Sequence, residues 1–96
     1  MADVLLHLRN PLAALRRLRA LTTPGGSALV TDVFEPYLKD TVMHYRGGSE
    51  NLIWWTPSLD CLVQLVYDEG FSTVEALTTY TIPGRAGWRA VMRASP

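Results

Sequence analysis

The order of the apolar segments along the 96-residue chain is the feature that most constrains its fold. A short apolar run over residues 2–8 is typical of the end of a strand, and a run over residues 28–31 is typical of a buried strand. Between them, apolar residues recur at helical spacing. A strand–helix–strand connection of this kind favours a parallel sheet with a right-handed crossover.

The first helix has clear boundaries in the sequence. Asn10 is a favourable N-cap, and Pro11 suits the first helical position because the N–H that proline lacks would be unpaired there. A Pro-Gly-Gly turn over residues 24–26 stops the helix. Its expected apolar stripe consists of Leu12, Ala14, Leu15, Leu18 and Leu21.

The second half of the chain combines a long loop with a helix and two strands. Residues 32–57 carry no regular apolar pattern, and such a stretch in a small domain indicates a lid, a binding loop or a disordered segment. Ser58 then caps a helix that ends at Gly70. Residues 74–82 and 88–93 alternate in polarity around a short turn, which predicts an antiparallel hairpin. The expected fold class is α/β, with parallel strands closed by an antiparallel hairpin.

Length, charge and cysteine content limit the classes of protein to consider. A chain of 96 residues forms one small domain, and its net charge of zero creates no overall field that attracts nucleic acid or anionic membranes. Cys61 is the only cysteine, so an internal disulfide is excluded. No apolar run approaches the roughly 20 residues that span a bilayer. We therefore expect a cytoplasmic protein with no membrane partner.

Four short motifs follow one another along the chain. They are an apolar segment that ends at His7 before Pro11, the turn at residues 24–26, the sequence Trp54-Trp55-Thr56-Pro57-Ser58-Leu59, and the sequence Asp68-Glu69-Gly70-Phe71. In this order and spacing they resemble the C-terminal half of a class I S-adenosylmethionine (SAM) dependent methyltransferase. The tryptophan motif is similar to that of a subgroup akin to the tRNA wobble-uridine methyltransferases, which transfer a carboxymethyl group.

The resemblance implies a fold, a cofactor and a domain boundary. Residues 1–96 would form a partial Rossmann-like methyltransferase domain, from the end of its fourth strand to its seventh strand, with SAM as the cofactor. The family holds SAM with a Gly-rich turn after the first strand, which allows close backbone approach to the cofactor. Neither Gly25-Gly26 nor Gly47-Gly48 follows a strand and opens a helix. The SAM-binding N-terminal half is therefore expected to be absent, and the chain alone is expected to be inactive.

The resemblance also implies roles for individual residues. His7 lies where the family's fourth strand meets the active-site cleft, so it is the candidate catalytic residue; packing at a strand end is the alternative. Leu6 and Arg85 occupy cofactor-binding positions, although Arg85 also fits a plain surface position. The carboxymethyl-transferring relatives have a tyrosine where this chain has Leu6. Leucine cannot donate the corresponding hydrogen bond, so carboxymethyl transfer is not expected.

Candidate substrate-binding residues follow the central strand and lie in the long loop. Asp32 and Glu35 come after residues 28–31, and ligands of open α/β sheets bind beyond the carboxyl ends of strands. Trp54 and Trp55 either close over a planar substrate or fasten the loop to the core. Asp40, His44 and Glu50 lack the spacing of metal ligands, so no metal is expected.

Three functions remain open from the sequence. The chain is a methyltransferase fragment, a non-catalytic α/β binding module that uses the loop of Trp54 and Trp55, or an unrelated small α/β domain. The methyl acceptor is either a small molecule or tRNA. An incomplete sheet would expose a strand edge, so we also expect a partner chain or self-association to cover that edge.

Overall fold

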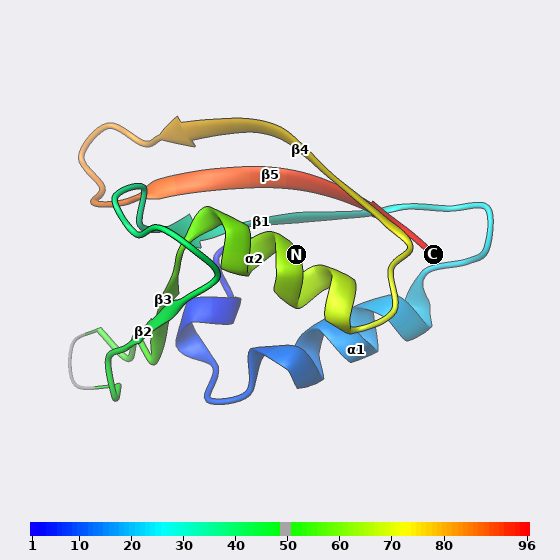
Figure 1. The fold of residues 1–96 in the computed structure, drawn as a ribbon, viewed down its shortest axis with the longest axis horizontal. Coiled ribbons are helices and arrows are strands. Elements are labelled where there is room, and N and C mark those ends of the chain that lie inside the picture. The colour runs from blue at the N-terminus through cyan, green and yellow to red at the C-terminus, as the bar shows by residue number, and fades with distance from the viewer. Residues whose placement is uncertain (49–50) are drawn as a thin grey trace.

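The structure, a computed structural model, describes residues 1–48 and 51–96. It contains a small mixed α/β domain with two helices and two separate antiparallel sheets (Figure 1). In chain order the elements are η1 (Leu5–His7, a 3-10 helix), α1 (Pro11–Leu21), β1 (Ala28–Phe34), β2 (Met43–Tyr45), β3 (Trp55–Pro57), α2 (Leu59–Asp68), β4 (Thr73–Thr81) and β5 (Trp88–Ser95).

The main sheet is antiparallel throughout, so the expected parallel sheet is wrong. Its strand order is β1-β5-β4, and β5 lies between two strands that both run antiparallel to it. Phe34 lies opposite Trp88 in the β1–β5 pair, and Ala28 lies opposite Ala94. The C-terminal hairpin of β4 and β5 is antiparallel, and it has a β-bulge between Ala76 and Thr78.

The first eight residues do not form the strand that their apolar character predicts. Ala2 makes one isolated parallel bridge to Thr31, and the chain then turns into η1. The backbone N–H groups of Val4 and Leu5 donate to the carboxylate of Asp32, at 3.1 and 2.9 Å. The carboxylate of Asp32 thus accepts the N–H bonds that a neighbouring strand would otherwise accept. The pairing of this segment with β1 therefore ends after the one bridge between Ala2 and Thr31.

The long segment without a sequence pattern is partly regular. β1 continues through Asp32 to Phe34, three residues beyond the expected strand end. β2 and β3 then form a two-stranded sheet in which Tyr45 lies opposite Trp55. Each of these strands has only three residues, which is too short for an alternating pattern to be recognised.

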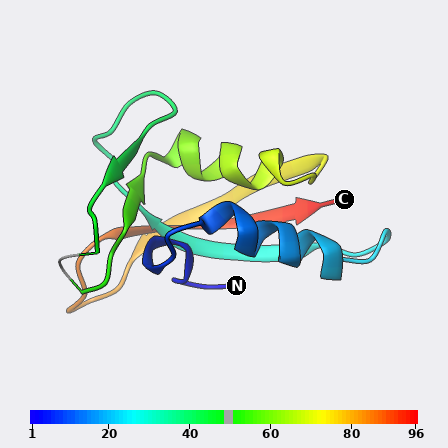
Figure 2. The same cartoon turned by 90° about the horizontal axis from the view of Figure 1, so that it is seen from below.

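Both helices begin at the predicted residues and lie on the same side of the main sheet (Figure 2). The side chain of Asn10 accepts a hydrogen bond from the N–H of Ala13, and that of Ser58 accepts one from Cys61. Leu15 is fully buried, whereas Leu21, the last residue of the predicted stripe, is 81% exposed. No helix in the described part of the chain is long and apolar enough to cross a membrane.

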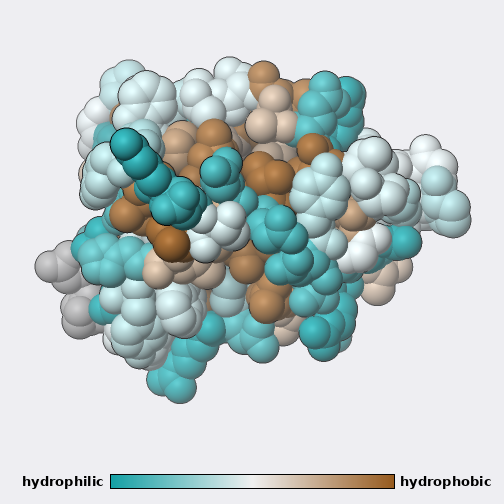
Figure 3. Space-filling model, viewed as in Figure 1, coloured by the Kyte–Doolittle hydropathy of each residue, from teal (hydrophilic) through white to brown (hydrophobic). Residues whose placement is uncertain are grey.

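The core lies between the two helices and the inward face of the sheet. Its fully buried large side chains are Leu15, Val30, Leu62, Val66 and Met92. On the face drawn in Figure 3, apolar residues gather over the middle of the molecule, between α2 and the sheet, with hydrophilic residues around them. β4 is the least covered strand, because seven of its nine residues are exposed.

Candidate functional site

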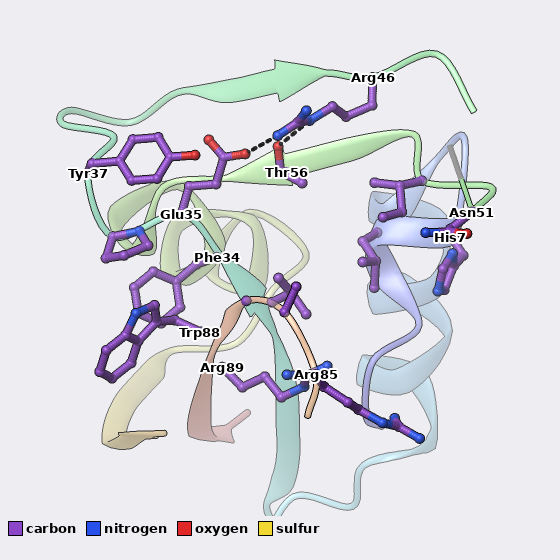
Figure 4. Close-up of a pocket in the computed structure, with 16 residues that line it drawn as sticks. His7, Phe34, Glu35, Tyr37, Arg46, Asn51, Thr56, Arg85, Trp88 and Arg89 are labelled. Atoms are coloured by element: carbon purple, nitrogen blue, oxygen red, sulfur yellow. Dashed lines mark hydrogen bonds and ion pairs between the residues drawn. The ribbon is translucent and has the colours of Figure 1, made fainter. Parts of the chain in front are cut away.

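A cavity of about 710 Å³ lies at the end of β1, where Phe34 ends the strand and Glu35 follows it (Figure 4). η1 and β3 contribute to its walls, and so does the segment from Arg85 to Arg89 that leads into β5. The antiparallel register creates this arrangement, because Trp88 and Arg89 lie opposite Phe34 and Val33. A cavity of this size accommodates a small-molecule ligand.

The cavity brings together four of the seven site residues predicted from the sequence. Leu6, His7, Glu35 and Arg85 all line it. Asp32 and Trp55 line a much smaller internal space under η1. Trp54 lines neither of them.

His7 is held by a hydrogen bond that determines its tautomer. Its Nδ1 lies 3.1 Å from the carbonyl oxygen of Leu52. A carbonyl oxygen only accepts hydrogen bonds, so Nδ1 must carry the proton. In the neutral ring, Nε2 then has a free lone pair, and the side chain is exposed at the cavity wall. This is the geometry of a proton acceptor.

The turn that supplies this carbonyl is strained. Leu52 has a φ angle of 57°, in the left-handed region that a leucine seldom adopts, and it follows Asn51, whose φ of 51° is one that asparagine tolerates. Strain of this kind persists only where the surrounding structure holds it, and it is common beside functional sites. The contact with His7 is one of the interactions that hold this turn in place.

Glu35 forms an ionised cluster at the end of the cavity opposite Arg85 and Arg89 (Figure 4). Its side chain is 9% exposed and is paired with the guanidinium of Arg46, which also donates to Thr56 at 3.2 Å. Burial alone would raise the pKa of Glu35. The hydrogen bonds from Thr56 and Arg46 lower this pKa by more than burial raises it, so the net shift is downward. Glu35 is therefore a fixed carboxylate that accepts hydrogen bonds, and it is poorly suited to donating a proton.

Asp32 has a role within the fold. Its residue is 1% exposed, and its carboxylate accepts backbone N–H bonds from Val4, Leu5 and Val33. These bonds engage both oxygens of the carboxylate. Burial raises the pKa of Asp32, and the backbone hydrogen bonds only partly oppose the shift. The structure thus gives Asp32 contacts to the segment before η1 and none to the cavity that the other predicted residues share.

Trp54 and Trp55 fasten β3 to the turn that precedes α1. The indole N–H of Trp55 donates to the carbonyl of Arg9 at 3.1 Å, and its ring meets that of Tyr45 edge-on at 4.9 Å. The guanidinium of Arg9 lies 4.5 Å from the ring of Trp54. Of the two roles proposed for this pair, these contacts favour fastening over closing across a ligand.

Arg89 and the aromatic wall of the cavity were not predicted from the sequence. Arg89 reads as part of an exposed basic face, yet its side chain is only 7% exposed and pairs with Asp3 at 3.0 Å. The rings of Phe34, Tyr37 and Trp88 lie on the side of the cavity away from His7 (Figure 4). The pairing of β5 with β1 brings these residues together, and no local sequence pattern indicates that pairing.

The described residues do not fit SAM or a metal ion. The carboxylate of Asp32, within β1, is buried and already accepts three backbone N–H bonds, so it offers little to ribose hydroxyls. At Gly48 an added Cβ would meet the ring of Trp54 at 2.7 Å, so this glycine admits an indole ring and makes no phosphate cradle. In the described part of the chain, no three His, Cys, Asp or Glu side chains are grouped as metal ligands.

No model of a known protein family matches the chain, and no curated protein sequence matches it significantly. The methyltransferase resemblance therefore rests on the sequence motifs.

Proposed function

We propose that this chain is the acceptor-binding part of a SAM-dependent methyltransferase. The observation that carries the proposal is the cavity at the end of β1, where His7 presents Nε2 in a wall that Glu35 and Arg85 also line at other points. The sequence motifs that resemble the family independently assign His7 to the active-site cleft. The two lines of support are separate, because one depends on motif order and the other on side-chain geometry.

The residues of the chain have distinct roles in this function. When bound, SAM would supply the methyl group, and none of the roles below requires a described residue to hold it. Nε2 of His7 accepts the proton from a hydroxyl or amine of the acceptor, and the electron pair stays on the acceptor's heteroatom. The paired Glu35 and Arg46 give the cavity a rigid polar wall that orients the acceptor.

The second candidate is a binding module that performs no chemistry. The lack of a fit for SAM favours it, since the same cavity can hold a ligand without a cofactor. A version that uses Trp54 and Trp55 as the binding surface has less support, because both rings are engaged with Arg9.

The genomic sequence upstream of the Met1 codon separates the two candidates. We expect an in-frame segment that encodes a strand, a Gly-rich turn and a helix. The extended protein should transfer a labelled methyl group from SAM to an acceptor in a cell extract, and His7→Ala should lower that transfer about 100-fold or more. Arg17→Ala, on the exposed face of α1, is the control and should leave the transfer unchanged. An extended protein with no transfer would leave the binding module as the function.

A further inference from the structure

The inward face of β4 is uncovered beyond Val74. Ala76 lies opposite Met92 in the β4–β5 pair, and Thr79 lies opposite Ala90. Residues directly opposite one another in an antiparallel pair point to the same face of the sheet, and both β5 residues are fully buried in the core. Ala76 and Thr79 are nevertheless exposed. The core face of the sheet therefore continues onto β4, where the described residues leave it open.

α2 borders this open surface with apolar side chains. The helix packs against both α1 and β4, and the ion pair of Glu69 with Arg16 fixes the flank that faces α1. Val63 and Tyr67 lie one turn apart on the opposite flank; Val63 is partly buried against the core, and Tyr67 is 40% exposed. Apolar residues gather between α2 and the sheet in Figure 3. We define the β4 strip as the surface formed by Val63, Tyr67, Ala76 and Thr79.

The backbone at the outer edge of β4 is open to a further strand. β4 pairs only with β5 among the described residues, and it contains no proline. A second extended chain can add to such an edge through main-chain hydrogen bonds, and its alternate side chains then lie over the β4 strip. In this binding mode the main chain supplies affinity and the alternate side chains supply specificity.

The elements around the β4 strip are acidic. Residues 51–84 contain acidic side chains but no lysine, arginine or histidine. Glu69 and Glu75 pair with arginines of α1 and β5. Asp60 and Asp68 are exposed on α2 and make no ion pair with another described residue. The negative charge that remains beside the strip favours a basic partner over a neutral or acidic one.

We propose that β4 binds an extended peptide segment in which apolar residues alternate with lysine or arginine. The segment adds to the sheet as a strand beside β4, its apolar side chains cover the β4 strip, and its basic side chains balance the acids of α2 and β4. A second copy of this chain would bring the same acidic elements to the shared edge, so it is a poorer occupant than a basic segment. No residue of the β4 strip lines the cavity at the end of β1, so this binding does not depend on the proposed function.

The test is the binding of two matched fluorescent peptides to the purified chain, at protein concentrations where the chain sediments as a monomer. One short peptide alternates valine with lysine, and the other alternates valine with glutamate. We expect anisotropy to give saturable binding of the lysine peptide, with a Kd at least about tenfold lower than that of the glutamate peptide. Amide hydrogen exchange over residues 73–81 should become slower when the lysine peptide is bound. Methylation of alternate backbone N–H groups of this peptide should weaken its binding at least about tenfold, because the methylated strand cannot pair with the edge.

Matched substitutions locate the site. Ala76→Lys places a charged side chain on the β4 strip and should raise the Kd of the lysine peptide about tenfold, whereas Ala20→Lys, on the exposed face of α1, should leave it unchanged. Asp60→Asn removes one exposed charge beside the strip and should raise the Kd about threefold.

Several outcomes would overturn the proposal. Equal affinity for the lysine and glutamate peptides would remove the role of charge, and equal effects of Ala76→Lys and Ala20→Lys would place the binding elsewhere. Unchanged hydrogen exchange over residues 73–81 would show that no strand is added at β4. Self-association through β4 without any binding of the lysine peptide would assign the edge to a second copy of the chain instead.

Discussion

Asp32 and Glu35 show how two carboxylates three residues apart serve different purposes. Asp32 is buried in the fold, and burial raises its pKa. Three backbone N–H groups donate hydrogen bonds to its carboxylate and only partly oppose this rise. Glu35 points into the cavity, where bonds from Thr56 and Arg46 outweigh burial and lower its pKa. Because the pKa of Asp32 is raised on folding, its ionisation makes the folded state less stable as pH rises. Because the pKa of Glu35 is lowered on folding, its ionised form stabilises the folded state above the ordinary pKa of 4.5.

Replacement of Glu35 by glutamine should change how stability depends on pH. In the native chain, the stabilisation from Glu35 is present above pH 4.5 and is lost as pH falls through the lower pKa of the folded state. We expect Glu35→Gln to lower the free energy of unfolding by about 1 kcal/mol at pH 7, since Arg46 is partly exposed to solvent. Chemical denaturation at pH 7 and at pH 3 measures the difference, which should become smaller at the lower pH. The control is Glu75→Gln, in an exposed pair with Arg93, and an equal effect there would contradict the expectation.

Replacement of Asp32 by asparagine should destabilise the segment before η1. Asparagine has one acceptor oxygen, so its amide nitrogen would face a backbone N–H that now donates to the carboxylate. We expect the free energy of unfolding to fall by about 1–3 kcal/mol, because a buried donor loses its partner. Hydrogen exchange at the amides of Leu5 and Val33 should become faster. Unchanged exchange at both amides, as expected for Asp60→Asn on the exposed side of α2, would show that Asp32 does not hold this segment.

At the scale of elements, local signals predicted the helices and failed for the sheet. The N-caps Asn10 and Ser58 act within three residues of themselves, so the sequence alone locates both helix starts. Strand direction depends on partners that are distant in sequence, such as Phe34 and Trp88. The capture of the Val4 and Leu5 amides by Asp32 is likewise invisible in a pattern of apolar residues.

Some residues that line the cavity were predicted from the sequence, and others were not. His7 was predicted because it belongs to an ordered motif, Arg85 because of its spacing to Trp88 in the family resemblance, and Glu35 because it follows a buried strand. Arg89, Trp88 and Phe34 reach the cavity only through the register of β1 with β5. The residues that reach the cavity through strand pairing were therefore not predicted, whereas the motif residue His7 was.

The contacts of β3 predict different costs for its two tryptophans. Trp55→Ala removes a hydrogen bond to Arg9 and an edge-on ring contact, and we expect it to lower the free energy of unfolding by about 2–3 kcal/mol. Trp54→Ala removes a cation–π contact at a partly exposed ring, which costs about 0.5–1 kcal/mol. Trp88→Ala, at the mouth of the cavity, should change stability least. Denaturation monitored by circular dichroism gives the three values, and a largest loss for Trp88 would reverse the assignment.

At the scale of the whole molecule, the chain should not bind SAM by itself. No Gly-rich turn links a strand to a helix in the sequence, and Asp32 is committed to backbone amides. Isothermal titration of the purified chain with SAM and with S-adenosylhomocysteine should therefore give no saturable heat. Binding of either compound at micromolar concentration with one-to-one stoichiometry would mean that the chain holds the cofactor at a place other than the cavity at the end of β1.

The outer edge of β4 is the surface on which self-association should occur. β1 is partly covered at its own edge, because the backbone of Met1 and Asp3 exchanges hydrogen bonds with Thr31. β4, in contrast, is the terminal strand of the sheet and pairs only with β5 among the described residues. It is nine residues long with Glu75 as its one charged side chain, and Leu77 at the bulge is 44% exposed. A long edge with little charge is a template for pairing with another chain.

We therefore expect the purified chain to self-associate through β4, and a lysine on that strand to prevent it. Leu77→Lys introduces a charge on the edge, where a second strand would have to bury it, so the variant should sediment as a monomer at concentrations where the native chain forms dimers or larger species. Leu21→Lys adds the same charge at the end of α1, where the side chain is 81% exposed and is not part of the sheet, and should leave the association unchanged. Sedimentation velocity over a range of concentrations measures all three proteins. A native chain that stays monomeric throughout would show that the bulge and the twist of β4 already protect its edge.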